Sequence, residues 1–116
     1  MEDLNYQPVE SLSDARLLED LQSGDPARIA NALYSAVRFC DDSKWTQDHC
    51  IAFLTSPHVS VRWAAATCLG DLAFLRKSIN AQIALDALIK AQEDQSIADP
   101  VSFSISLVNQ FAISSH

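Results

Sequence analysis

The chain of 116 residues contains only two glycines and four prolines. A sandwich or barrel of many short strands needs turn residues at each connection, and this chain has too few of them. Hydrophobic residues make up 48% of the chain, which is enough to build a core and excludes wholesale disorder. The length matches a single domain, which we place over residues 1–116. Together these features predict an all-α fold.

Signals for membrane insertion and secretion are also lacking. No apolar run approaches the roughly 18 residues that a membrane span requires. The N-terminal stretch MEDLNYQPVE is acidic, whereas a secretory signal begins with basic residues. The three cysteines, Cys40, Cys50 and Cys68, cannot all pair with one another, and a reducing compartment explains this most simply. We therefore expect a soluble cytoplasmic protein without disulfides.

Basic residues are scarce: eight Lys and Arg stand against 15 Asp and Glu, a net charge of −7. Nucleic-acid binding depends on Lys and Arg that neutralise phosphates, so a nucleic-acid partner is disfavoured. Residues 1–25 hold seven acidic residues and only one basic residue, Arg16. This asymmetry favours a basic protein partner, although a solvated helix surface would carry the same charges. The acidic candidates for partner contact are Glu10, Asp14, Glu19, Asp20, Asp41 and Asp42.

Motifs for catalysis and metal binding are missing as well. The chain has neither a Cys-x-x-Cys nor a His-x-x-x-His pair, and the adjacent His49 and Cys50 point to different sides of a helix. It has no Gly-x-Ser-x-Gly elbow, and its two glycines cannot form a phosphate-binding loop. We expect no enzymatic activity, no cofactor and no metal. Cys40 and Cys68 are expected to be small buried core residues.

Apolar residues recur at helical spacing after an extended lead-in over residues 1–10. Ser11 or Ser13 can cap a first helix that ends at Ser23-Gly24, and Asp25-Pro26 starts the second. The apolar stripe of the first helix consists of Leu12, Leu17, Leu18 and Leu21. Further helices are expected over residues 44–55, 58–75 and 79–93, and the last of these is apolar almost all round, which predicts a buried helix.

The segment over residues 101–108 alternates apolar residues with serines, as a strand does. Asp99-Pro100, however, repeats the start of the second helix, and Phe103, Leu107 and Phe111 recur at helical spacing. A lone strand in a helical chain would have no partner to pair with. We therefore expect a helix here, beginning at Asp99-Pro100.

An internal repeat relates the second helix to the fourth. An offset of 32 residues aligns six apolar positions: Ile29 with Val61, Ala32 with Ala64, Leu33 with Ala65, Ala36 with Cys68, Val37 with Leu69 and Cys40 with Leu72. Such a period, with two helices in each unit, is typical of α-solenoids. Residues 56–72, SPHVSVRWAAATCLGDL, resemble the first helix of a HEAT repeat, and LLEDLQSGDPAR over residues 17–28 resembles a junction between two HEAT units. The resemblance implies a short α-solenoid of about three helical hairpins.

Two tryptophans lie off the main apolar stripes, and each has two interpretations. Trp63, beside Arg62, and Trp45, one turn from His49, can be buried between repeats. Alternatively, they can anchor a partner, because Trp and Arg are enriched at the centres of protein interfaces. All four residues are therefore candidates for partner contact.

Small acidic HEAT-like proteins resemble the immunity proteins of bacterial toxin systems. This resemblance implies a non-catalytic protein that neutralises a cognate toxin, often a basic nuclease domain, by forming a tight complex. The alternative is a small HEAT-type adaptor, similar to the accessory proteins of bilin lyases, that binds a peptide or a pigment. Neither interpretation involves nucleic acid or a membrane. The sequence leaves the oligomeric state open.

Overall fold

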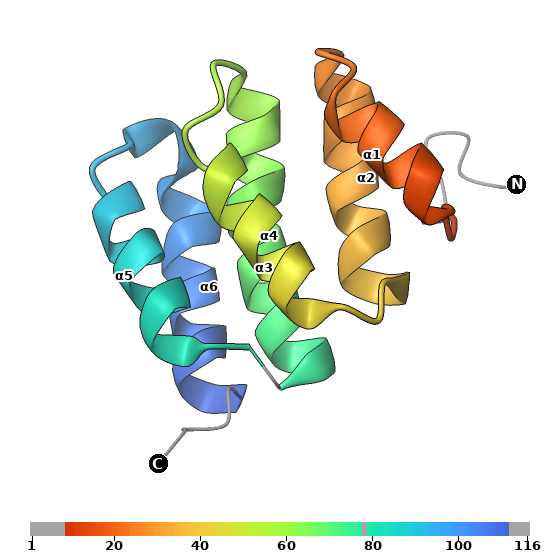
Figure 1. The fold of residues 1–116 in the computed structure, drawn as a ribbon. Coiled ribbons are helices and arrows are strands. Elements are labelled where there is room, and N and C mark those ends of the chain that lie inside the picture. The colour runs from red at the N-terminus through yellow and green to blue at the C-terminus, as the bar shows by residue number, and fades with distance from the viewer. Residues whose placement is uncertain (1–8, 78, 112–116) are drawn as a thin grey trace, which may run out of the picture.

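The computed structural model describes residues 9–77 and 79–111 of the protein (Figure 1). Within these ranges every regular element is helical, so the prediction of an all-α fold is confirmed. None of the described helices is long and apolar enough to cross a membrane. The elements are α1 (Asp14–Leu21), α2 (Pro26–Phe39), α3 (Ser43–Phe53), α4 (Val59–Arg76), α5 (Ala81–Ala91), the 3-10 turn η1 (Gln95–Ile97) and α6 (Ala98–Phe111).

The helices form three consecutive pairs, α1–α2, α3–α4 and α5–α6, arranged in two layers. Figure 1 shows α1, α3 and α5 in the front layer, with α2, α4 and α6 behind them. α4 lies at the centre and packs against α2, α3 and α6. The pairing matches the helical hairpins expected from the sequence, while the resemblance to HEAT repeats stays a prediction.

Capping residues define most helix starts. Ser13, rather than Ser11, caps α1 by accepting a hydrogen bond from the backbone N–H of Arg16. Asp25 caps α2 with Pro26 in its first turn, as predicted. Asp42 caps α3 and Asn80 caps α5 in the same way. These short polar side chains satisfy N–H groups that have no partner within the helix.

The aligned repeat positions form much of the core. Eleven of the twelve residues in the six aligned pairs are buried, and the exception is Cys40, which is half-buried where α2 ends. The prediction of a core cysteine is therefore confirmed for Cys68 and wrong for Cys40. Cys50, on α3, is also fully buried.

Small residues allow α4 and α6 to approach closely. Gly70 of α4 faces Ser104 of α6, and a Cβ atom at Gly70 would lie 2.9 Å from the Cα atom of Ser104. The Ser104 hydroxyl donates a 2.6 Å hydrogen bond to the carbonyl oxygen of Ala66. This bond satisfies a hydroxyl that is buried in the interface between two helices.

The structure corrects three expectations about the helices. α5 is not buried all round: Ile83 and Ile89 are 51% and 54% exposed, because only one side of α5 contacts the rest of the molecule. Leu18 does not belong to the core stripe of α1 and is 44% exposed. Residues 101–108 are helical as predicted, but Asp99-Pro100 does not start α6, since Asp94 caps η1 and this turn runs directly into α6 at Ala98.

Candidate partner-binding surface

A hollow of about 240 Å³ lies between the first turns of α1 and α3. We call it the α1–α3 hollow. Its lining combines two carboxylates with apolar side chains, one of which is the exposed Leu18. Its lining residues are Asp14, Leu17, Leu18, Cys40, Asp42 and Trp45.

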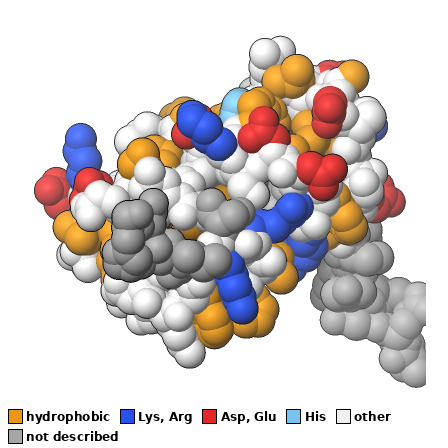
Figure 2. Space-filling view, turned by 60° about the horizontal axis from the view of Figure 1, so that its bottom comes forward, with side chains coloured by type: hydrophobic (Ala, Val, Ile, Leu, Met, Phe, Trp, Pro, Cys, Tyr) orange, Lys and Arg blue, Asp and Glu red, His pale blue; other side chains and the backbone are white. Residues whose placement is uncertain are grey.

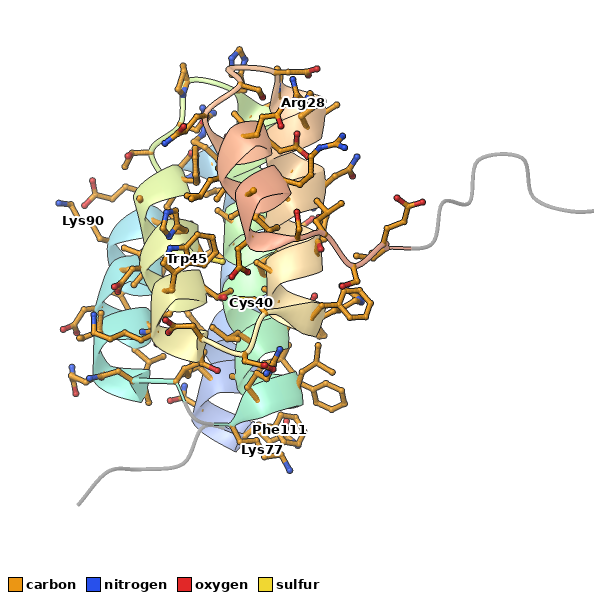
Figure 3. The ribbon with its side chains drawn as sticks, turned by 45° about the vertical axis from the view of Figure 1, so that its right-hand side comes forward. Arg28, Cys40, Trp45, Lys77, Lys90 and Phe111 are labelled. Carbon is orange, nitrogen blue, oxygen red and sulfur yellow. The ribbon has the colours of Figure 1, made fainter. Side chains whose placement is uncertain are left out.

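Local hydrogen bonds fix the side of the hollow that α3 contributes. The Asp42 carboxylate accepts a 3.0 Å hydrogen bond from the backbone N–H of Trp45, which sets the start of α3 and the direction in which Trp45 leaves it. Cys40 ends α2, and its carbonyl oxygen accepts a 2.6 Å hydrogen bond from the guanidinium of Arg76. Figure 3 shows Trp45 and Cys40 on neighbouring segments. The short loop between α2 and α3 is therefore held at both ends.

Trp45 stacks on His49, one turn further along α3. The centres of the two rings are 4.1 Å apart at an interplanar angle of 36°. His49 Nδ1 lies 2.9 Å from the carbonyl oxygen of Trp45, and because a carbonyl only accepts, Nδ1 carries the proton in this contact. The stacking restricts the rotamers of Trp45, so less side-chain entropy would be lost if a partner covered it.

Other predicted acidic residues are neutralised within the chain. Asp20 is buried, and Arg28 and Arg16 approach its carboxylate to 2.6 Å and 3.0 Å. Burial by itself raises the pKa of Asp20, but the hydrogen bonds from Arg28 and Arg16 outweigh it and hold the pKa below its ordinary value. Glu19 lies 3.4 Å from Arg28.

Glu10 lines a different hollow, of about 410 Å³, together with Arg16, Asp20 and Arg28. The structure therefore places Glu10, Glu19 and Asp20 apart from the α1–α3 hollow. These three residues lie close to Arg16 and Arg28, which form the ion pairs of α1 and α2 among the described residues.

The carboxylates at the α1–α3 hollow differ from this group. Within residues 9–77 and 79–111, no basic side chain lies within ion-pair distance of Asp14, Asp41 or Asp42. All three are exposed. Figure 2 shows acidic side chains at the upper right and at the left edge of this face of the molecule, with most of the basic side chains between them. Because Asp14, Asp41 and Asp42 are exposed and form no ion pair among the described residues, their negative charge is available to a partner.

The structure separates Arg62 and Trp63 from the α1–α3 hollow. Arg62 is engaged internally: it donates to Asp94, to the carbonyl oxygen of Ser56 and to Ser96. Trp63 is 43% exposed on α4, so burial between repeats, one of its two interpretations, is wrong. Neither residue lines the α1–α3 hollow.

Of the ten predicted contact residues, the structure thus brings five to one place. Asp14, Asp42 and Trp45 line the α1–α3 hollow, His49 stacks on Trp45, and Asp41 precedes Asp42 in the chain. Sequence reasoning missed three apolar residues that line the hollow, Leu17, Leu18 and Cys40. Helical geometry could have identified Leu18 as exposed. It follows the buried Leu17 by one residue, and each residue turns the side chain by about 100° around the helix axis, away from the buried side.

No group of His, Cys, Asp and Glu side chains in the described part of the chain is arranged to hold a metal ion. No family model matches the chain. No curated protein matches it either. Among solved structures, the chain is similar to one chain in the crystal structure of a CDI complex from Cupriavidus taiwanensis, with 26% sequence identity and a TM-score of 0.86. The match covers 96% of this chain and 100% of the other.

Proposed function

We propose that this protein is a non-catalytic binding module that neutralises a cognate toxin by forming a tight complex with it, as an immunity protein does. The observation that carries the proposal is the likeness to a chain of a CDI complex, which extends over the whole length of that chain. A match over separate segments would indicate only shared helical hairpins. A match over the complete chain supports a shared mode of action as well.

The charge distribution supports a basic toxin domain as the partner. The chain carries a net charge of −7, and the carboxylates of Asp14, Asp41 and Asp42 are exposed and form no ion pair among the described residues. Opposite charges on two partners accelerate their encounter, and this acceleration falls as salt screens the charges. We therefore expect association with the toxin to slow as the salt concentration rises.

The test begins with affinity capture of the tagged protein from its own cells and identification of the protein retained in a one-to-one ratio. The purified retained protein is then assayed for toxicity while this protein is titrated in, with an unrelated acidic protein of similar size as the control. We expect toxicity to be lost at one molar equivalent and to be unaffected by the control. At a concentration of this protein about ten times the dissociation constant of the complex, about 90% of the toxin would be bound. Full toxicity at that concentration would overturn the proposal.

A further inference from the structure

Four of the described carboxylates take part in ion pairs, and nine do not: Glu10, Asp14, Asp25, Asp41, Asp42, Asp71, Asp86, Glu93 and Asp99. Asp20, Glu19, Asp48 and Asp94 each lie within 3.4 Å of a basic side chain of the same chain. Asp14, Asp41 and Asp42 have no such neighbour among the described residues, although they stand close together around the first turns of α1 and α3. Asp42 interacts electrostatically with the exposed Lys44, which itself pairs with Asp48, and a basic partner would add favourable charge contacts to all three carboxylates.

Asp14 and Asp42 also stabilise their own helices, because they lie at the N-termini of α1 and α3, where the helix dipoles are positive. Each helix N-terminus contributes roughly half a positive charge, so α1 and α3 together offset about one of the three negative charges. Lys44, which attracts Asp42, is already paired with Asp48, and Arg76 adds one positive charge nearby through its hydrogen bond to the carbonyl oxygen of Cys40. The charge count around the α1–α3 hollow therefore stays negative. Cations are favoured there and anions are not.

The floor of the α1–α3 hollow is apolar. Leu18 exposes 44% of its surface, and Trp45 lies half-buried opposite with its ring held by His49. At about 240 Å³ the hollow is smaller than the roughly 300–1,000 Å³ of typical small-molecule pockets. It has room for one large apolar side chain, and held tryptophans are frequent anchors at protein interfaces.

We propose that the α1–α3 hollow is the docking site for a basic segment of the protein partner, in which one apolar side chain is flanked by lysines or arginines. The apolar side chain packs against Leu18 and Trp45, and the flanking cations pair with Asp14, Asp41 and Asp42. Charge complementarity selects this occupant over an acidic or a purely apolar one. The inference rests on the proposed function, since it assumes that the chain binds a protein.

The first test needs no knowledge of the partner. A synthetic peptide with one leucine between two pairs of lysines is titrated into the isotope-labelled protein at low salt, and binding is followed by NMR. We expect the signals of Leu18 and of the Trp45 indole to shift, with no shift for a peptide in which glutamates replace the lysines. Shifts confined to other surfaces would overturn the inference.

Matched variants separate local from overall charge. The triple variant Asp14→Asn, Asp41→Asn, Asp42→Asn is compared with the control Asp25→Asn, Asp86→Asn, Asp99→Asn. Each triple removes three negative charges, replaces one N-cap by asparagine, which also caps well, and changes one residue in a first helical turn. We expect the first triple to weaken peptide binding about tenfold and the control to change it less than about twofold. Equal losses in both triples would overturn the inference.

The apolar contact is tested in the same way. Leu18→Ser removes the exposed leucine of the hollow, and Ile89→Ser removes a comparably exposed side chain on α5. We expect weaker peptide binding only for Leu18→Ser. Because both side chains are half-exposed, both variants should fold, which circular dichroism checks.

A final comparison distinguishes this inference from the proposed function. If the Asp14, Asp41, Asp42 triple neutralises the captured toxin as well as the unmodified protein does, docking at the hollow is overturned and the proposed function stands. If the peptide binds at the hollow but no toxin is neutralised, docking is supported and the proposed function falls. If the first triple loses toxin binding and the control keeps it, both are supported.

Discussion

The guanidinium of Arg62 lies 2.8 Å from the carboxylate of Asp94, across the boundary between the second and third helix pairs. Arg62 belongs to the first turn of α4, and Asp94 caps the turn that leads into α6. The same guanidinium donates a 2.8 Å hydrogen bond to the carbonyl oxygen of Ser56, in the loop before α4. One side chain therefore ties two loops and a helix start together, which indicates a structural role for Arg62.

We predict that Arg62→Lys destabilises the protein by about 1–2 kcal/mol, because an ammonium group cannot donate in the planar pattern that reaches Asp94, Ser56 and Ser96 at once. Urea unfolding followed by circular dichroism measures the change. Lys44→Ala, which breaks the solvent-exposed pair with Asp48, is the control and should leave the unfolding midpoint unchanged. Reduced partner affinity without a loss of stability would instead place Arg62 in the interface.

The close approach of α4 and α6 at Gly70 leads to a second prediction. Gly70→Ala should lower the free energy of unfolding by about 1–3 kcal/mol, although alanine favours a helix interior over glycine by about 1 kcal/mol. The added methyl group would collide with the backbone and side chain of Ser104, and backbone cannot move aside cheaply. A melting temperature lowered by several degrees is expected, and an unchanged or raised one would contradict the packing described here.

The helical fold was predictable because burial in this chain follows the repeat. Ile29 and Val61, or Ala36 and Cys68, occupy equivalent core positions, and a spacing rule finds them without coordinates. Exposure was harder to predict. α5 has apolar residues on every side except the stripe of Gln82, Asp86 and Lys90, and its place at the edge of the front layer leaves Ile83 and Ile89 in solvent.

The candidate site was only partly predictable, since net charge does not tell which carboxylates are free. Asp14 and Asp20 look alike in the sequence, six residues apart and on the same helix. The structure pairs Asp20 with Arg16 and with Arg28 of the next helix, and leaves Asp14 beside the hollow. The α1–α3 hollow itself arises from two helices that are separated in the chain by α2, which periodicity within one helix cannot reveal.

The buried carboxylate of Asp20 should make stability depend on pH. Its pKa in the folded protein lies below the ordinary 3.8, so its ion pairs contribute fully above that value and are lost as the pH falls through the lower, folded value. We predict that Asp20→Asn costs about 1–3 kcal/mol near neutral pH and progressively less below about pH 4. Urea midpoints of both proteins from about pH 7 to pH 2 measure the difference. A difference that stays constant down to the lowest pH would contradict the ion-pair role.

The three thiols should differ in reactivity. Cys50 and Cys68 are fully buried, whereas Cys40 is half-buried and lines the α1–α3 hollow. Burial, with a further contribution from the neighbouring Cys50, raises the pKa of the Cys68 thiol well above its ordinary value, which disfavours the reactive thiolate. We therefore predict that a disulfide reagent such as Ellman's modifies one thiol per folded chain rapidly, and all three only after unfolding.

Cys40→Ser is the matched variant for this experiment and should abolish the rapid phase while leaving the slow one. The same reaction also reports on the α1–α3 hollow, because a basic segment seated against Leu18 and Trp45 would cover the Cys40 sulfur. We predict that saturating amounts of the leucine-centred lysine peptide slow the rapid phase and that the glutamate peptide does not. A rapid phase that persists in Cys40→Ser would show that a core thiol is accessible, and would contradict the packing of α3 against α4 described here.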